Sequence, residues 1–267
     1  MRRVRYSVFM SNRDGSHDKI ILDQFTRQAE TFGVVQSHSD KEAMAELVRL
    51  LVLGTRDEVL DVACGPGIVA CELAPHAKRV VGVDFVPAML DKARTRAAGL
   101  GIANAEWRRG DGGQLDFPDA CFSRVVTRYS FHHMLRPAET LAEMTRVCGV
   151  GGLVVVIDAT PEAGKQQAYN DWERLRDPSH ATAMTRAELL ATAEGLPLRL
   201  EAEHFYRLDC SLAGVLGSSF PVERAGAVYA RQLSDDVGRD TLSVAAYRRD
   251  GALWFGFPIT IAVWRKV

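Results

Sequence analysis

The feature that most constrains the fold is a regular alternation of short apolar segments with helical patterns, starting at residue 58. The apolar segments are "EVLDVA", "RVVGVD", "AEWRRGD", "FSRVVTR" and "GGLVVVID", and helical patterns over 66–76, 87–99 and 137–147 separate most of them. Neighbouring parallel strands need a crossover connection, usually a helix, so this alternation is typical of a doubly wound, Rossmann-like α/β fold.

Two further strands are expected after this region. "LPLRLEAEHFYRL" and "ALWFGFPITIAVWRKV" have the composition of long strands, and helical patterns cover 18–32, 39–54, 161–180 and 185–195. Ser39 and Glu42 stand in capping-box register at the start of the second of these helices. We therefore predict a mostly parallel seven-stranded sheet with an antiparallel last strand and helical lid additions.

Composition excludes several classes of protein. With 267 residues, 47% of them hydrophobic, and a net charge of −1, the chain has no overall positive field to attract nucleic acid or an anionic membrane. Five cysteines without a C-x-x-C pair argue against a disulfide framework and structural zinc. No apolar run approaches the length of a membrane span. We predict a cytoplasmic protein without metal, nucleic-acid partner or membrane insertion.

The stretch "LDVACGPGIVACELA", residues 60–74, places a glycine-rich bend between the first strand and a helix. "GPGIVA" fits the pattern G-x-G-x-x-A, and Asp84 follows Gly65 at the spacing of a ribose-binding acid, so the spacing alone allows a dinucleotide. However, the carboxylate of Asp61 would repel the pyrophosphate of NAD at this bend. A cofactor with a positive head, such as S-adenosylmethionine, fits these acids better.

Four ordered motifs carry a family resemblance: "VLDVACGPG", "VVGVDFVPAML", "WRRGDGGQLDFPDACFSRVVTRYSFHHM" and "LAEMTRVCGVGGLVVVID". Over about residues 20–160 the chain resembles the class I S-adenosylmethionine-dependent methyltransferases of the ubiquinone/menaquinone C-methyltransferase type. The resemblance implies that the glycine-rich bend binds the methionine part of the cofactor, through Asp61, Ala63, Gly65 and Gly67. It further implies that Asp84 binds the ribose, that Asp111 binds the adenine amino group, and that Phe85 and Met89 pack on adenine.

Further cofactor contacts are expected from the other strand ends, at Gly110, Gly112 and Arg128, and from Phe25 of the first helix, as the N-terminal helix covers the cofactor in related enzymes. Local alternatives stay open for several of the implied roles. Asp84 could cap the helix that begins at Pro87, Asp111 could form a turn, and Phe85 and Met89 could be core residues.

Three residues after the fourth strand are candidates for a general base, namely Tyr129, His132 and His133. Adjacent residues of an extended chain point in opposite directions, so at most one histidine is expected to face the acceptor. The segment "RDPSH" supplies Arg176 and His180 as candidate acceptor-binding residues, although a charged turn at a helix end is the alternative.

The expected function is methyl transfer to N, O or C of a small aromatic or quinone-like metabolite, by a monomer or homodimer. An NAD(P)-dependent oxidoreductase and a non-catalytic S-adenosylmethionine-binding protein are the alternatives. Residues 1–17 are expected to be a disordered extension, in which Met10 is an alternative start, and residues 18–267 to be a single domain. Within it we expect a lid (18–54), a cofactor-binding core (55–158), acceptor-side additions (159–250) and a closing strand (251–267).

Overall fold

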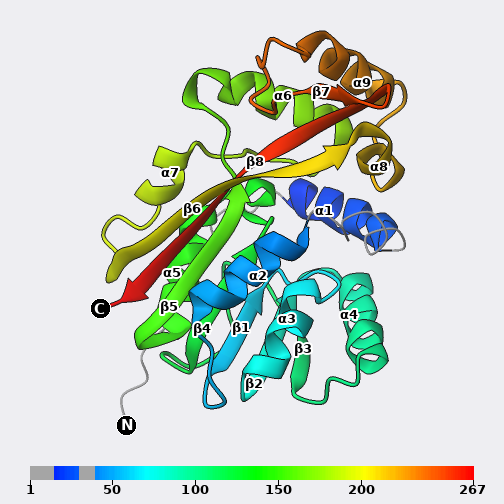
Figure 1. Ribbon diagram of the computed structural model, residues 1–267. Coiled ribbons are helices and arrows are strands. Elements are labelled where there is room, and N and C mark those ends of the chain that lie inside the picture. Colours follow the sequence, from blue (N-terminus) through cyan, green and yellow to red (C-terminus); the bar gives the residue numbers. More distant parts are fainter. Residues whose placement is uncertain (1–14, 30–39) are drawn as a thin grey trace.

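The computed structural model describes residues 15–29 and 40–267 of the chain (Figure 1). The strands are β1 Glu58–Val62, β2 Arg79–Asp84, β3 Ala105–Arg109, β4 Phe122–Arg128, β5 Cys148–Ala159, β6 Leu198–Ser211, β7 Tyr247–Arg249 and β8 Ala252–Lys266. The α-helices are α1 Gly15–Gln28, α2 Asp40–Leu51, α3 Ile68–Leu73, α4 Pro87–Gly99, α5 Pro137–Val147, α6 Gln166–Arg176, α7 Arg186–Ala191, α8 Leu212–Gly217 and α9 Ala225–Asp236. Short 3-10 helices cover η1 Ala74–His76, η2 Phe131–His133 and η3 Ala163–Lys165.

The strands form one mixed sheet in the order β3-β2-β1-β4-β5-β8-β6. The first five of these are parallel to one another, and β8 lies antiparallel between β5 and β6. The chain order reverses at β1, where β2 lies on one side and β4 on the other. The predicted α/β fold with a mostly parallel sheet is confirmed, and such a sheet binds ligands beyond the carboxyl ends of the strands at this reversal.

The described part of the sheet has eight strands where the sequence analysis expected seven. The additional strand, β7, pairs with the first residues of β8 through Tyr247↔Trp254 and Arg249↔Ala252. It contains only three residues, too few for a period-two pattern to be recognised in the sequence. The helices α8 and α9 lie within the predicted acceptor-side additions, in a stretch for which the sequence analysis named no element.

Apolar side chains cover both faces of the parallel strands, because each face packs against helices. Val59, Val80 and Val155 face a core that includes Leu47 and Leu51 of α2. Their neighbours along the strands face a second core that contains Leu141 and Met144 of α5. This double burial explains why "RVVGVD" and "LVVVID" are almost continuously apolar.

The C-terminal additions lie over one end of the sheet. Figure 1 shows α6, α8 and α9 gathered around the far ends of the long strands β6 and β8, with α1 below them. Trp172 of α6 stacks on Tyr229 of α9, with ring centroids 4.1 Å apart, and its indole N–H donates to the Tyr229 carbonyl at 3.1 Å. These helices therefore form a packed layer above the carboxyl ends of β4 and β5.

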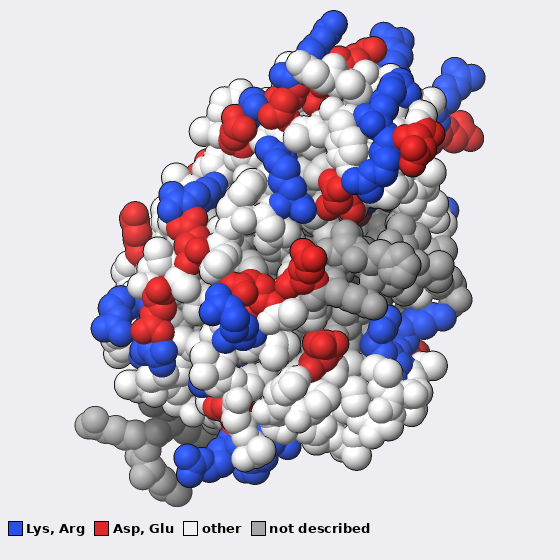
Figure 2. Space-filling model, viewed as in Figure 1, with Lys and Arg blue, Asp and Glu red and all other residues white. Residues whose placement is uncertain are grey.

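On the face of the molecule shown in Figure 2, positive and negative side chains do not form separate patches. In Figure 2 the Lys and Arg side chains are interspersed with Asp and Glu. Within residues 15–29 and 40–267, the structure contains no helix with the length and apolar composition needed to cross a bilayer. In the same ranges, no three His, Cys, Asp or Glu residues gather in a way that could hold a metal ion.

The predicted capping residue Ser39 and the end of the first predicted helix, including Phe32, lie outside the described residues.

Gly82 of β2 is required by close packing against Trp107 of β3. A Cβ atom at position 82 would lie 2.6 Å from two atoms of the Trp107 ring and 2.8 Å from the Cys64 sulfur. We predict that Gly82→Ala lowers the free energy of unfolding by about 1–3 kcal/mol, the usual cost of overpacking, as measured by urea denaturation.

Gly99→Ala is the matched control, because a Cβ at that position meets no atom within 4 Å. Its stability should be unchanged or slightly higher, since alanine favours helix over glycine. Equal denaturation midpoints for Gly82→Ala and the unmodified protein would show that the Trp107 packing is adaptable.

Candidate functional site

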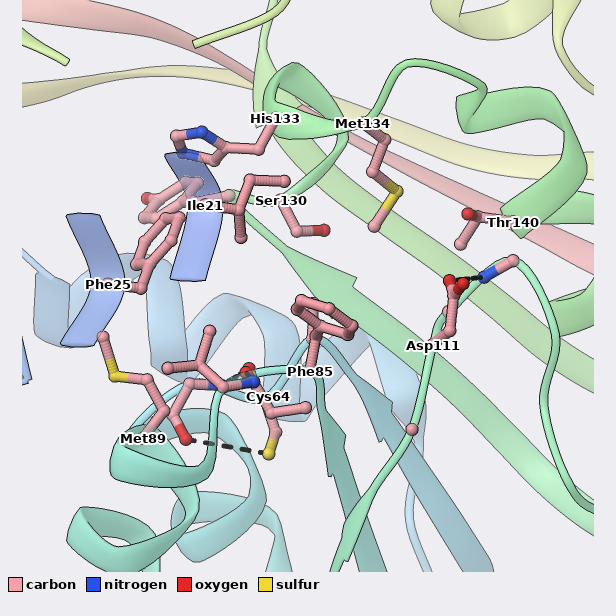
Figure 3. Close-up of a pocket in the computed structure, with 18 of the residues that line it drawn as sticks. Ile21, Phe25, Cys64, Phe85, Met89, Asp111, Ser130, His133, Met134 and Thr140 are labelled. Carbon is pink, nitrogen blue, oxygen red and sulfur yellow. Dashed lines mark hydrogen bonds between the residues drawn. The ribbon is translucent and has the colours of Figure 1, made fainter. Parts of the chain in front are cut away.

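A cavity of about 480 Å³ lies at the carboxyl ends of β1, β2, β3 and β4. We call it the first cavity. Its walls come from the glycine-rich bend, the segments after β2, β3 and β4, and α1 (Figure 3). The residues of the predicted cofactor site that line it are Phe25, Asp61, Ala63, Gly65, Asp84, Phe85, Met89, Gly110, Asp111, Gly112 and Arg128. Gly67 is the one predicted cofactor residue that does not line it.

The bend after β1 has a backbone that only small residues adopt easily. Ala63, Gly65 and Gly67 all have positive φ angles, of 55°, 52° and 75°. A Cβ on Gly67 would lie 2.5 Å from the Trp107 ring. Gly67 therefore allows the tight turn and its close packing against Trp107. Ala63 and Gly65 form part of the wall of the first cavity.

Asp61 is buried at the base of the first cavity, and its Oδ2 accepts the backbone N–H of Ala70 at 3.1 Å. Burial raises the pKa of Asp61 to about 8, and the nearby charge of Asp84 adds to the effect of burial. A cationic group placed in the first cavity would therefore stabilise the ionised carboxylate of Asp61 and lower its pKa.

The carboxylate of Asp84 links two backbone segments, and α4 has no side-chain cap at its N-cap residue Val86. Its Oδ1 accepts the N–H of Val86 at 2.8 Å, next to the start of α4, and its Oδ2 accepts the N–H of Gly65 at 2.7 Å. The second bond joins the end of β2 to the glycine-rich bend. Because each carboxylate oxygen can accept more than one hydrogen bond, Asp84 still has capacity for a ligand hydroxyl.

The segment after β3 forms one end of the first cavity. The backbone N–H of Gly113 donates to Asp111 Oδ1 at 2.8 Å, as in the turn considered for this residue. Gly110 is required by close packing, because a Cβ there would lie 2.9 Å from a methyl group of Val83. Figure 3 shows Asp111 and Thr140 on one side of the cavity and Phe25, Ile21 and Met89 on the other, with Phe85 between them.

A second cavity, of about 690 Å³, adjoins the first. Phe25, Tyr129 and His133 line both, so the two cavities meet at these residues. Tyr129 has an unusual φ angle of 56°, and its hydroxyl lies 2.6 Å from that of Tyr206. The other walls of the second cavity come from α1, α6, β6, β8 and η2.

His132 lines the second cavity and is held by a buried carboxylate. Its Nδ1 donates to Asp158 Oδ1 at 2.5 Å, and Asp158 Oδ2 accepts the backbone N–H of Phe131 at 2.6 Å. Burial disfavours the charged imidazolium, but the charge and hydrogen bond of Asp158 outweigh it and raise the pKa of His132 above its ordinary value. Since Nδ1 carries a proton, neutral His132 has a bare lone pair on Nε2, for which no partner exists among the described residues.

His133 has a different environment. Its ring makes an edge contact with Phe25, and its backbone carbonyl accepts a hydrogen bond from His17 Nε2 at 2.8 Å. Burial, together with the charge of His132, lowers the pKa of His133 to about 4. Its Nδ1 lies 3.1 Å from both the carbonyl and the hydroxyl oxygens of Ser179. His133 is therefore neutral and holds α1 against η2.

The two residues predicted to bind the acceptor are placed differently. Arg176 lines the second cavity, where its guanidinium pairs with Glu173 at 2.6 Å and contacts Ser219. His180 is buried and lines neither cavity, and its Nε2 lies 2.6 Å from Asn170 Oδ1.

Sequence reasoning missed several residues of the site. Asp158 stands at the end of "LVVVID", so the rule that singled out Asp61, Asp84 and Asp111 as acids at strand ends could have found it. Ile21, Met134 and Thr140 of the first cavity carry no such signal. Their position depends on how α1 and α5 pack onto the sheet.

The residues that line the first cavity include five carboxylates, of Asp18, Asp61, Asp84, Asp111 and Glu139, and two guanidiniums, of Arg128 and Arg136, between apolar walls. A dinucleotide would add the negative charge of its pyrophosphate to this group of acids and would disfavour the ionised form of Asp61 further. A zwitterionic amino-acid group beside a nucleoside suits the same residues. Its ammonium can neutralise Asp61, and Phe85 and Met89 offer a flat apolar surface for a base. The residues therefore fit S-adenosylmethionine.

Comparison with known proteins gives the same result. Residues 59–152 match the family described as "Methyltransferase domain". The malonyl-[acyl-carrier protein] O-methyltransferase of Serratia marcescens is 31% identical over 184 residues, which cover 64% of this chain and 68% of that protein. The demethylmenaquinone methyltransferase of Deinococcus radiodurans is 42% identical over 107 residues, which cover 39% of this chain and 44% of that protein.

A solved structure supports the fold. The uncharacterized methyltransferase YcgJ of Bacillus subtilis is 26% identical over 166 residues, which span 61% of this chain and 66% of the relative. Its crystal structure superposes with a TM-score of 0.78, at 20% identity, over 84% of this chain and 98% of that chain. The matches confirm the resemblance found in the sequence motifs. The chain belongs to the class I S-adenosylmethionine-dependent methyltransferases, in the group related to the ubiquinone/menaquinone C-methyltransferases.

Proposed function

We propose that this protein transfers a methyl group from S-adenosylmethionine to a hydroxyl oxygen of a small, largely apolar acceptor. The observation that carries the proposal is that the second cavity, which is lined by His132 with its buried partner Asp158 behind it, meets the first cavity at Phe25, Tyr129 and His133. Two ligands, one in each cavity, would therefore be in contact at this junction.

The first cavity would hold the cofactor. Asp61 would take the ammonium group, Arg128 the carboxylate, Asp84 the ribose hydroxyls and Asp111 the adenine amino group. Phe85 and Met89 would pack on the adenine, and Phe25 of α1 would exclude water from the junction. When bound, S-adenosylmethionine supplies a methyl group on a sulfonium sulfur, and its transfer leaves S-adenosylhomocysteine.

The second cavity would hold the acceptor. Phe257, Ile259 and Leu208 give it apolar walls, as a flat metabolite requires. Neutral His132 would accept the proton of the acceptor hydroxyl on Nε2 as the new oxygen–methyl bond forms. Asp158 would stabilise the resulting imidazolium and keep the ring oriented, and His132 would then return the proton to water.

The two alternative classes are less compatible with the site. An NAD(P)-dependent oxidoreductase would have to accommodate a pyrophosphate beside Asp61. A non-catalytic cofactor-binding protein would have no use for an adjoining second cavity lined by a histidine with a free ring nitrogen. The names of two relatives, an O-methyltransferase and a demethylmenaquinone methyltransferase, support an acceptor that carries oxygen. The cytoplasmic location and the monomeric or dimeric state stay predictions.

Calorimetric titration tests the cofactor half of the proposal. S-adenosylhomocysteine should bind with micromolar affinity or better, whereas NAD and NADP should not bind. In Asp84→Ala the affinity should fall by about 1–3 kcal/mol, because the ribose hydroxyls lose a charged partner. Comparable binding of NAD would contradict the proposal.

A pH titration tests the role of Asp61. Its pKa of about 8 means that it is mostly protonated at neutral pH without ligand. Because the ammonium group favours the ionised carboxylate, binding should release a proton, and affinity for S-adenosylhomocysteine should rise by up to about tenfold per pH unit below that pKa. Binding enthalpies measured in buffers of different ionisation enthalpy count the released proton. Asp61→Asn should abolish the release, and an unchanged release in that variant would assign the proton to another group.

A third experiment tests the proposed base by measuring transfer of a labelled methyl group to a panel of hydroxylated aromatic compounds. We expect His132→Ala to lower kcat by about 10²–10⁴, the usual contribution of a general base, while affinity for S-adenosylhomocysteine stays the same. In the unmodified protein, kcat should rise with pH as His132 loses its proton, through a pKa above the ordinary histidine value. Labelling of the panel that is unaffected by His132→Ala would show that methyl transfer needs no base.

A further inference from the structure

Two polar side chains that line the second cavity, His132 and Tyr169, both pack near the ring of the buried His180. His132 comes from η2, Tyr169 from α6, and His180 from the turn after α6. The ring centroids of His132 and His180 are 5.4 Å apart, and those of Tyr169 and His180 are 6.2 Å apart. Each side chain has a polar atom that the described protein leaves without a partner.

The free atom of His180 follows from the hydrogen bonds around Asn170. Asn170 Oδ1 accepts the backbone N–H of Ala183 at 2.7 Å, so the amide is fixed with its oxygen toward His180. His180 Nε2 therefore carries the proton, and Nδ1 is an acceptor. This Nδ1 is one of only two buried side-chain polar atoms that lack a hydrogen bond in the described residues.

Tyr169 is 1% exposed and lines the second cavity, yet its hydroxyl has no hydrogen-bond partner in the described ranges. Tyr229 provides the contrast, because its buried hydroxyl donates to Glu173 at 3.1 Å. Because Tyr169 lines the second cavity, its hydroxyl can donate a hydrogen bond to a ligand there. Burial also raises the pKa of Tyr169, so its hydroxyl remains a hydrogen-bond donor.

The geometry points to Tyr169 as a substrate-positioning residue that donates a hydrogen bond to a second oxygen of the acceptor, adjacent to the hydroxyl that His132 deprotonates. The acceptor class is then a vicinal two-oxygen compound, such as a 1,2-dihydroxy or 2-hydroxycarbonyl arrangement. This inference rests on the proposed function and specifies its substrate class.

The test compares matched probes that differ in one oxygen, catechol with phenol and 1,2-dihydroxynaphthalene with 1-naphthol. Methyl transfer and calorimetric binding to the protein loaded with S-adenosylhomocysteine are both measured. The unmodified protein should favour the two-oxygen member of each pair by roughly tenfold, equivalent to one well-made hydrogen bond. Tyr169→Phe, which removes only the hydroxyl, should abolish this preference by raising KM, with kcat and cofactor affinity unchanged.

Tyr229→Phe is the matched control, since it removes a buried tyrosine hydroxyl that lines neither cavity. It should keep the preference even where thermal stability falls, which separates substrate positioning from a structural role. Equal treatment of the paired probes by the unmodified protein, or a preference that survives in Tyr169→Phe, overturns the inference. Failure of S-adenosylhomocysteine to bind would instead overturn the proposed function.

Discussion

The close approach of backbone at the bend after β1 is the constraint on which the first cavity depends. Gly67 and Gly82 both face the Trp107 ring, at distances that leave no room for a Cβ atom. This packing brings the bend against β2, where Asp84 accepts the N–H of Gly65. The bend, Asp61 and Asp84 thereby form one rigid unit, and a rigid unit orders fewer groups when a ligand binds.

Three aspartates at the carboxyl edge of the sheet have different pKa shifts, because their surroundings differ. Asp61 is buried without a cation close enough to ionise it fully, so its pKa is raised. Asp158 is equally buried, but the charge and hydrogen bond of His132 outweigh burial and lower its pKa. Hydrogen bonds from three backbone groups, those of Val86, Gly65 and Phe85, lower the pKa of Asp84, yet burial prevails and the pKa is raised. The first acid suits a cationic ligand, and the second is matched to a base.

The helical additions determine what can reach the junction of the two cavities. α1 contributes Phe25 to both cavities, and Gln28 of the same helix donates to Asp177 after α6 at 3.3 Å. The layer of α6 and α9, fixed by the stacking of Trp172 on Tyr229, carries Tyr169, Glu173 and Arg176 to the second cavity. The N-terminal and C-terminal parts of the chain thus enclose the second cavity together.

The sequence by itself determined the alternation of strands and helices and the acids at the ends of the parallel strands. Both are local patterns that can be recognised within a few residues. It left open which of Tyr129, His132 and His133 could act as a base, and it did not identify Asp158 or single out Tyr169 from the other aromatics. Only tertiary structure decided these points. The partner of His132 is 26 residues away along the chain, and its pKa depends on burial created by several segments. Such long-range proximity leaves no periodic signal in the sequence.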